Sequence, residues 1–258
     1  MPTLLFPSPI FGPVSSRRLG VSLGVNLLPA DGKLCTFDCI YCECGFNDDH
    51  PPKAAIPTRS EVATALEARF RQMQNDHTPP DVITFAGNGE PTMHPQFAGI
   101  IADTIALRDR YFPKAKVSVL SNATYSHRPA VREALMSIDN NILKLDTVDP
   151  SFIRLVDRPL RRYDVEEMIE NLCRFEGKVQ VQTMFLRGTY NGTPLDNTTD
   201  AYVTPWIEAL RRIRPECVYI YTIDRDTPAT GLLKASPATL DAIALRVKEA
   251  GFKCSVSY

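Results

Sequence analysis

The stretch Cys35-Thr36-Phe37-Asp38-Cys39-Ile40-Tyr41-Cys42 places three thiols close together, at C-x3-C-x2-C spacing. A loop this short can fold three sulfur atoms around one inorganic centre, because thiolates are soft ligands for iron–sulfur clusters and for zinc. A [4Fe–4S] cube has four irons and usually takes four Cys ligands, so three ligands leave one iron open to a reactant.

Two other interpretations of this loop stay open. It could be a structural zinc loop with Cys44 as the fourth thiolate, or its cysteines could be buried without a metal. The spacing favours a cluster over zinc, because zinc loops usually divide their ligands into two separated pairs. Cys173, Cys217 and Cys254 are scattered over predicted helices and strands and are expected to be small buried hydrophobic residues.

Around these residues the sequence resembles radical S-adenosylmethionine (SAM) enzymes. Tyr41 matches the aromatic residue that precedes the third cysteine in that family, and the stretch from Gly87 to Thr92 resembles its Gly-Glu-Pro motif, which binds the amino group of SAM. Leu143-Lys144-Leu145-Asp146 resembles the fourth barrel strand. Upstream, the residues from Ser16 to Asn26 are similar to the lead-in of the branch related to tRNA wybutosine synthesis.

The resemblance implies a cofactor pair and a reaction. Cys35, Cys39 and Cys42 would hold a [4Fe–4S] cluster, and SAM would chelate the fourth iron. An electron, delivered by a donor such as a flavodoxin or ferredoxin, would split SAM into methionine and a 5′-deoxyadenosyl radical that abstracts hydrogen from the substrate. A fourth thiolate on that iron would block SAM, so Cys44 is predicted not to be a ligand.

Length, charge and cysteine content narrow the class of protein. The 258 residues, 44% of them hydrophobic, suit one radical SAM domain, with a lead-in over 1–30, a barrel core over about 20–225 and a C-terminal helix and strand over 226–258. A net charge of −1 argues against nucleic-acid binding through bulk electrostatics. No apolar run is long enough to span a membrane, and prolines interrupt the first eleven residues, so a signal peptide is not expected. Seven cysteines without an export signal predict a cytoplasmic protein.

Predicted strands and helices alternate about six times along the chain. Among the strands are apolar runs over 82–86, 116–120 and 179–186. Thr58-x-x-Glu61 predicts a capping box before a helix with Val62, Leu66 and Phe70 at helical spacing, and Asp164 is predicted to cap a later helix. This alternation indicates an α/β fold with parallel strands and right-handed crossovers. Six units suit the partial (β/α)6 TIM-like barrel that the resemblance implies, although a flat doubly wound sheet would give the same pattern. In either fold the C-terminal ends of the strands carry the chemistry.

The motifs that carry the candidate cofactor residues lie at the C-terminal ends of predicted strands. Lys144 and Asp146 alternate with leucines, so both should face one side of a strand, either toward a ligand or paired with each other. Ser121 and Asn122 precede Ala123, where the family often has glycine. The resemblance implies a cofactor-binding set of Tyr41, Gly87, Asn88, Gly89, Glu90, Ser121, Asn122, Lys144, Asp146, Met184 and Tyr221. Arg158, Arg187, Asn191 and Arg225 are predicted to contact substrate, because an arginine trio suits a phosphate or carboxylate.

Three functions remain open from the sequence. The first is modification of an RNA base, although this chain lacks the extra N-terminal cysteines of wybutosine-forming enzymes, since no Cys precedes Cys35. The second is radical chemistry on a small metabolite or a partner protein, including activation of a glycyl-radical enzyme. The third is a non-catalytic metal-binding protein.

Overall fold

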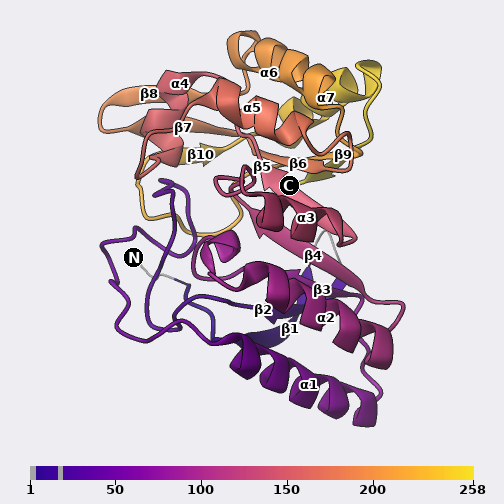
Figure 1. Ribbon diagram of the computed structural model, residues 1–258. Coiled ribbons are helices and arrows are strands. Elements are labelled where there is room, and N and C mark those ends of the chain that lie inside the picture. Colours follow the sequence, from indigo (N-terminus) through magenta and orange to yellow (C-terminus); the bar gives the residue numbers. More distant parts are fainter. Residues whose placement is uncertain (1–3, 17–19) are drawn as a thin grey trace. The chain divides into compact units, whose positions relative to one another are not determined.

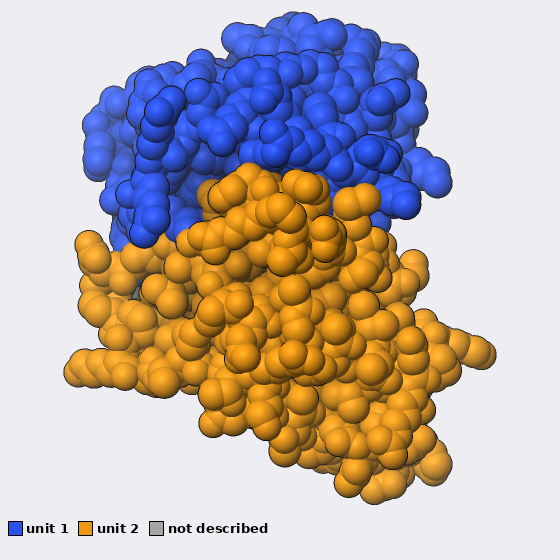
Figure 2. All heavy atoms as spheres, viewed as in Figure 1, with its two compact units in different colours: residues 1–4, 36–46, 142–258 blue, residues 5–35, 47–141 orange. Residues whose placement is uncertain are grey.

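The computed structural model describes residues 4–16 and 20–258, which gather into two compact units (Figure 2). Among the described residues, unit 1 contains Leu4, 36–46 and 142–258, and unit 2 contains 5–16, 20–35 and 47–141. Arg17, Arg18 and Leu19 of the predicted lead-in lie outside the described residues. The boundary falls inside the cysteine stretch, because Cys35 belongs to unit 2 whereas Cys39 and Cys42 belong to unit 1.

Unit 2 is built from strands that alternate with helices (Figure 1). Its strands are β1 (Ile10–Ser16), β2 (Gly20–Val25), β3 (Val82–Phe85) and β4 (Lys116–Ser121), adjacent in that order. The pairs β2–β3 and β3–β4 are parallel, whereas β1, which the sequence pattern did not predict, is antiparallel to β2. The helices are α1 (Arg59–Asn75), α2 (Phe97–Tyr111) and α3 (Pro129–Met136), with a 3-10 turn η1 (Pro91–Met93) before α2.

The start of α1 follows from its sequence. Thr58 is the N-cap and forms the predicted capping box with Glu61: the Thr58 hydroxyl accepts from the Glu61 N–H at 3.2 Å, and the Glu61 carboxylate accepts from the Thr58 N–H at 2.7 Å. The helix then buries Val62, Leu66 and Phe70, the residues that recur at helical spacing.

Thr58→Ala is expected to lower the free energy of unfolding by about 1 kcal/mol, because the Glu61 N–H at the helix start loses the hydroxyl oxygen that accepts from it. Urea denaturation measures the change. Thr64→Ala, on the exposed face of the same helix, is the matched control, and alanine there should be neutral or slightly stabilising. Equal losses at both positions would contradict the capping role.

Unit 1 contains the remaining parallel strands and a second, smaller sheet. The strands β5 (Asn140–Lys144), β6 (Gln180–Met184), β9 (Cys217–Tyr221) and β11 (Cys254–Ser257) are adjacent and parallel in that order. The smaller sheet is antiparallel, in the order β10 (Leu232–Lys234), β7 (Leu186–Tyr190), β8 (Thr193–Asp196). The helical segments are α4 (Pro150–Phe152), the π-helix η2 (Ile153–Asp157), α5 (Val165–Cys173), α6 (Asp200–Ile213) and α7 (Pro237–Glu249).

One predicted strand was wrong in extent. The apolar run over 179–186 predicts a single strand, but the structure ends β6 at Met184 and moves Leu186 into the smaller sheet. The side chain of Asn197 ends the strand here, because its Oδ1 accepts from the Leu186 N–H at 2.9 Å. The same sheet explains Asn191, which with Gly192 forms the two-residue turn between β7 and β8 and has a φ of +50°.

The six predicted strand–helix units are confirmed. Each of β2, β3, β4, β5, β6 and β9 has a parallel neighbour and is followed along the chain by a helix. The predicted cofactor motifs after β3, β4, β5, β6 and β9 all lie at or beyond the C-terminal ends of these strands. This is the end of a parallel strand where ligand sites of α/β proteins form.

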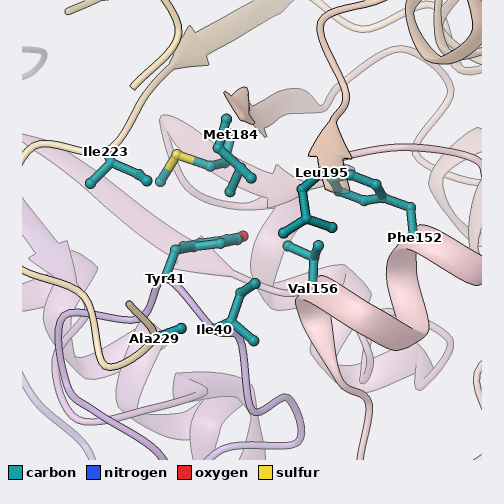
Figure 3. Close-up of a cluster of buried hydrophobic side chains, with 9 residues drawn as sticks. Ile40, Tyr41, Phe152, Val156, Met184, Leu195, Ile223 and Ala229 are labelled. Carbon is teal, nitrogen blue, oxygen red and sulfur yellow. The ribbon is translucent and has the colours of Figure 1, made fainter. Parts of the chain in front are cut away.

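The cysteine loop contributes to the core of unit 1. Ile40 is fully buried and Tyr41 is 8% exposed, and both pack in one apolar cluster (Figure 3). The other members of this cluster are Phe152, Val156, Met184, Leu186, Leu195, Ile223 and Ala229. Burial of two neighbouring side chains between Cys39 and Cys42 therefore fixes this half of the loop.

Candidate functional site

In unit 2, the residue before the first cysteine is bonded to the end of β3. The Leu34 N–H donates to the Asn88 carbonyl at 2.8 Å, and the Glu90 N–H donates to the Leu34 carbonyl at 3.2 Å. Gly89 makes this approach feasible, since a Cβ there would lie 1.9 Å from the Leu34 carbonyl oxygen. The Gly-Asn-Gly-Glu motif therefore fixes the start of the cysteine loop.

The side chain of Asn88 is engaged within the protein. It is fully buried, accepts from the Phe6 N–H at 2.8 Å and donates to the carbonyls of Phe6 and Pro29 at 2.9 and 2.8 Å. Gly87 in turn packs against the Asn26 side chain, 2.8 Å from where a Cβ would lie. These contacts give Asn88 and Gly87 a structural role; their predicted role toward a cofactor stays a prediction.

Glu90 is the centre of a buried hydrogen-bond network. Its Oε1 accepts from the Thr92 N–H at 2.9 Å, from the Thr92 hydroxyl and from the Ser121 hydroxyl at 2.8 Å, while Oε2 accepts from the Asn122 N–H at 2.6 Å. Burial raises the pKa of the Glu90 carboxyl, and the four donors partly offset this by stabilising the ionised form. A cationic amino group placed against Oε2 would stabilise the carboxylate further.

The network continues to the first cysteine. The Asn122 side-chain amide donates to Cys35 Sγ at 3.6 Å, so Glu90, Asn122 and Cys35 form one chain of contacts within unit 2. Ala123, where the family often has glycine, adopts a φ of +65°. The strand therefore ends in the left-handed turn that a glycine there would favour.

In unit 1, the rest of the cysteine loop is hydrogen-bonded to the segment after η2. The Ile40 N–H donates to the Val156 carbonyl at 2.9 Å, and the Asp38 N–H donates to the carbonyls of Asp157 and Arg158, both at 3.1 Å. On the other side the Ala229 N–H donates to the Ile40 carbonyl at 3.2 Å. These bonds position Cys39 on both of its flanks.

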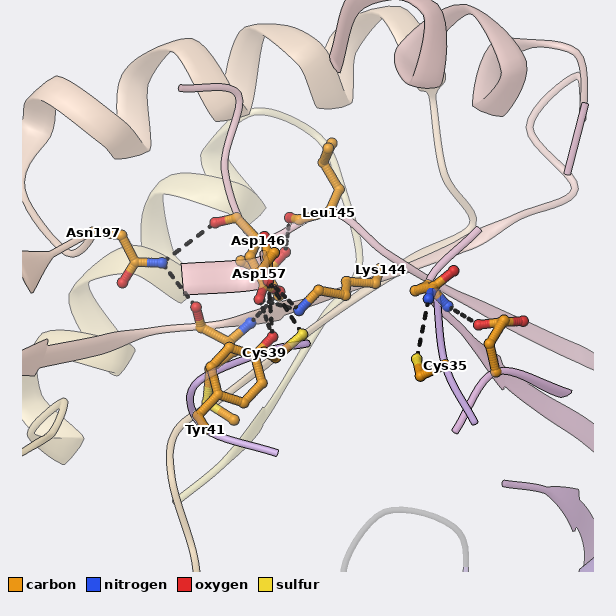
Figure 4. Close-up of polar contacts among 12 residues, drawn as sticks. Cys35, Cys39, Tyr41, Lys144, Leu145, Asp146, Asp157 and Asn197 are labelled. Carbon is orange, nitrogen blue, oxygen red and sulfur yellow. Dashed lines mark hydrogen bonds and ion pairs between the residues drawn. The ribbon is translucent and has the colours of Figure 1, made fainter. Parts of the chain in front are cut away.

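A buried charged network lies beside Cys39 (Figure 4). Lys144 Nζ pairs with Asp146 Oδ2 and, at 2.8 Å, with Asp157 Oδ1. The Tyr41 hydroxyl donates to Asp146, and Cys39 Sγ lies 3.7 Å from Asp157 Oδ1. The structure therefore shows Lys144 and Asp146 paired with each other, which is one of the two predicted alternatives. Asp157 is a third member of the network, and no sequence pattern indicated it.

Two carboxylates share one ammonium in this network. Burial raises the pKa of Asp157 to about 7, against the lowering effect of Lys144, and Asp146 adds to the rise. Burial alone would lower the pKa of Lys144, but the two carboxylates raise it well above its ordinary value. Lys144 therefore keeps its charge at neutral pH, and its ammonium also lies 4.5 Å from the centre of the Tyr41 ring.

The network is connected to the end of β6. The Met184 N–H donates to Asp146 Oδ1 at 3.0 Å, and Asn197 donates to the carbonyls of Met184 and Asp146 at 2.8 and 3.3 Å. Tyr221, at the end of β9, packs partly buried against the apolar cluster that contains Met184. Asn197 is only 1% exposed, and a single polar residue in a loop gives no signal from which this role could be predicted.

The predicted substrate arginines are not gathered around one ligand site by any contact of the described residues. Arg158 pairs with Asp38 at 3.2 Å and donates to the Tyr190 hydroxyl at 3.0 Å. Arg225 pairs with Glu43 at 2.5 Å, and Arg187 is exposed on β7. Two of the three therefore already have a carboxylate partner, and their contact with substrate stays a prediction.

The three motif cysteines are each half-buried, whereas Cys44 is buried. In the parts of the chain that the structure describes, no three Cys, His, Asp or Glu side chains are gathered into a ready-made metal site. The fit to a cluster rests instead on donor chemistry, since three thiols share one loop whose neighbouring backbone is held at Leu34, Asp38 and Ile40.

Cys173, Cys217 and Cys254 are only partly buried, which corrects the expectation that they are buried. Burial nevertheless raises the pKa of the Cys254 thiol to about 12, with Cys217 on the neighbouring strand adding to the rise. Its thiolate fraction at pH 8 is then roughly a thousandfold below that of a thiol with the ordinary pKa. Cys254 is therefore suited to packing rather than to binding a metal.

Alkylation of Cys254 by iodoacetamide in the folded chain should accordingly keep accelerating as the pH rises through 10. Mass spectrometry of the Cys254 peptide gives the rate. In denaturant the same peptide should reach its plateau near the ordinary thiol pKa of about 8.5. A plateau below pH 9.5 in the folded chain would contradict the burial effect.

Comparison with known proteins identifies the family. The sequence model of the radical SAM superfamily matches residues 31–221. The chain therefore belongs to the radical SAM superfamily, whose members use a [4Fe–4S] cluster and SAM. It is 33% identical over 186 residues to a UPF0026 protein of Helicobacter pylori. The aligned region covers 70% of this chain and 58% of the relative's length. A UPF0026 protein of Synechocystis is 31% identical over 231 residues, 86% of this chain and 78% of the relative.

Solved structures agree on the fold. A radical SAM methyltransferase from Sphaerobacter thermophilus aligns over 92% of this chain and 66% of its own, with a TM-score of 0.67 and 15% identity. Streptococcus suis SuiB bound to SAM aligns over 90% and 50%, with a TM-score of 0.63 and 14% identity. Archaeal TYW1 aligns over 89% and 72%, with a TM-score of 0.55 and 12% identity. The α/β fold is thus confirmed as the partial barrel type of these enzymes.

Proposed function

We propose that this chain is an enzyme that holds a [4Fe–4S] cluster through Cys35, Cys39 and Cys42 and uses it to cleave SAM reductively. The observation that carries the proposal is the C-x3-C-x2-C loop, whose cysteines are half-buried and whose backbone is bonded on both flanks of Cys39. When bound and reduced, the cluster supplies the electron that converts SAM into methionine and a 5′-deoxyadenosyl radical, which abstracts hydrogen from the substrate.

The residues of the chain have separate tasks in this proposal. Glu90 presents a rigid buried carboxylate to the amino group of SAM, with Ser121 and Asn122 fixing its orientation. Asn122 also orients Cys35, while the network of Lys144, Asp146 and Asp157 holds Tyr41 and lies against Cys39. The apolar cluster around Ile40 excludes water from one side of the loop.

The experiment is anaerobic reconstitution with iron and sulfide, reduction with dithionite, and chromatography after SAM is added. The expected products are 5′-deoxyadenosine and methionine. Cys39→Ala should lose both the iron and the cleavage, whereas Cys173→Ala, which removes a thiol outside the motif, should retain both. A chain that binds one zinc and never cleaves SAM would contradict the proposal.

The substrate and the electron donor are further parts of the proposal. No helix of the described chain is long and apolar enough to cross a membrane. All seven cysteines are free thiols, which persist in a reducing compartment, so we place the enzyme in the cytoplasm, where a flavodoxin or ferredoxin can supply electrons. The near-neutral charge favours a small molecule or a protein over RNA as substrate. Binding of tRNA that falls steeply with salt would instead favour an RNA substrate.

A further inference from the structure

The most basic cavity described within unit 1 lies outside the cysteine site. It has a volume of about 270 Å³ and is formed by one continuous segment, from α4 through η2 to the first residue of α5. Its lining residues are Pro150, Ile153, Arg154, Pro159, Arg161, Arg162, Tyr163 and Val165. None of these residues belongs to the predicted cofactor or substrate sets.

Three arginines line this cavity without a partner. In the described chain, the side chains of Arg154, Arg161 and Arg162 make no hydrogen bond or ion pair with another residue, in contrast to Arg158 in the same segment, which pairs with Asp38. Three guanidinium groups at one concavity repel one another, so they favour an anion that neutralises them.

The acidic residues nearest in sequence are occupied elsewhere. Asp149 caps α4, where its Oδ1 accepts from the Phe152 N–H at 2.7 Å and from the Ser151 hydroxyl. Asp164 caps α5, accepting from the N–H groups of Glu166 and Glu167 at 2.9 and 3.2 Å. Arg154 contributes to lowering the pKa of Asp149, but no carboxylate oxygen lies within ion-pair distance of it. The positive charge of the cavity is therefore not cancelled by its own segment.

The backbone of the segment is well fixed, which holds the three exposed arginines at set positions along it. Phe37 and Pro159 form an antiparallel bridge, and the Leu160 N–H donates to the Thr36 carbonyl at 2.9 Å. Tyr163 packs edge-on against Phe37, with ring centres 5.4 Å apart. The segment that carries the arginines is thus attached to the cysteine loop, and Tyr163 with the two prolines supplies apolar walls.

We propose that this cavity binds the phosphate group of a small phosphate ester. Guanidinium forks match phosphate oxygens in bidentate geometry, and a phosphate monoester offers three such oxygens to three arginines. A volume of about 270 Å³ admits a phosphate with a ring-sized group, and the wall of Tyr163 and prolines suits a sugar or base. This assignment does not depend on the proposed radical chemistry.

Binding to the reconstituted full chain tests the site. The probes are inorganic phosphate, adenosine 5′-monophosphate and adenosine, measured by calorimetry at constant ionic strength. Phosphate and the monophosphate should bind at one site per chain, and adenosine should not. Arg161→Gln/Arg162→Gln should weaken binding of the monophosphate by roughly tenfold or more, because two charge-assisted contacts are lost.

The control variants distinguish loss of the binding site from a change in net charge and from a loss of folding stability. Arg69→Gln/Arg211→Gln removes the same charge from two helices outside the cavity and should leave binding unchanged. Arg161→Lys/Arg162→Lys keeps the charge but loses the fork, so it should bind with intermediate affinity. Urea midpoints should be alike in all variants.

Three results would overturn the proposal. The first is binding of phosphate and monophosphate that is no stronger than binding of chloride. The second is an equal loss of binding in both Gln double variants. The third is binding of a short single-stranded RNA, abolished by Arg161→Gln/Arg162→Gln, without any binding of the monophosphate, which would assign the cavity to an RNA backbone. SAM cleavage measured on the same samples shows whether the proposed function fails separately.

Discussion

Replacement of Lys144 by Met is expected to lower the free energy of unfolding by about 3–5 kcal/mol, because it leaves the two buried carboxyls without a counter-charge. Lys144 is 8% exposed, and Asp146 and Asp157 are 4% and 2% exposed, so water cannot replace the lost ammonium. The urea midpoint of the metal-free chain measures the effect. The variant should also hold less iron after reconstitution, since Tyr41 and Cys39 both contact this network.

The pH dependence distinguishes a lost counter-charge from lost packing. Without the ammonium, which lowers it in the parent chain, the folded-state pKa of Asp157 rises further above its unfolded value. The folded variant then binds more protons than its unfolded form. Lowering the pH from 8 to 5 should therefore reduce the difference in the free energy of unfolding between the parent chain and Lys144→Met. A deficit that stays constant over this range would indicate packing instead.

Two variants control this prediction. Lys234→Met makes the same substitution in a pair with Asp224 that spans 4.0 Å, and its side chains are 56% and 35% exposed. An exposed pair contributes at most about 1 kcal/mol, so this variant should be nearly neutral. Lys144→Met/Asp157→Asn should be more stable than Lys144→Met alone, because one unpaired carboxyl is removed. Equal stability of Lys144→Met and Lys234→Met would contradict the account of the network.

Replacement of Gly89 by Ala is expected to lower the free energy of unfolding by about 3 kcal/mol or more. Gly89 has a φ of +137°, which side-chain-bearing residues rarely adopt, and the added Cβ would lie 1.9 Å from the Leu34 carbonyl oxygen. Relief of this clash must move Leu34 and with it Cys35. Both the urea midpoint and the iron content after reconstitution should therefore fall.

Gly251→Ala separates the clash from the backbone strain. Gly251 also has a positive φ, of +94°, but nothing lies within 4 Å of its added Cβ. The Gly251→Ala substitution should lower the free energy of unfolding by only about 1–2 kcal/mol, and the variant should bind as much iron as the parent chain. If Gly89→Ala behaves like Gly251→Ala in both measurements, the bond between Leu34 and the end of β3 does not position the cysteine loop.

Much of the fold could be predicted from local sequence. The capping box at Thr58, the cap at Asp164 and the apolar strand runs before Gly87 and Ser121 depend on neighbouring residues, and the structure places these elements as predicted. The prediction of one strand over 179–186 was wrong because the strand end is set by Asn197, a residue further along the chain whose side chain accepts a hydrogen bond from the Leu186 N–H. The strand β1 was missed because Gly12 and Pro13 interrupt its pattern.

The candidate site was predictable where a motif carries it and not where tertiary contacts do. The cysteines and Glu90 stand in recognisable spacing, and Glu90 indeed sits in a network with Ser121 and Asn122. Asp157 lies in a π-helix that no periodicity indicated, although a π-helix is often found at functional sites. Its place beside Cys39 follows only from the hydrogen bonds that join the loop to this segment.

Electron paramagnetic resonance of the reconstituted, dithionite-reduced chain, recorded before and after addition of SAM, tests the central claim most directly. A cluster with one open iron predicts a reduced-cluster signal that changes when SAM binds. The change should be weaker or absent in Glu90→Gln, while the signal itself remains. A chain that shows no cluster signal and holds zinc instead, or a signal that SAM leaves unaltered, would contradict the assignment of Cys35, Cys39 and Cys42 to a SAM-binding cluster.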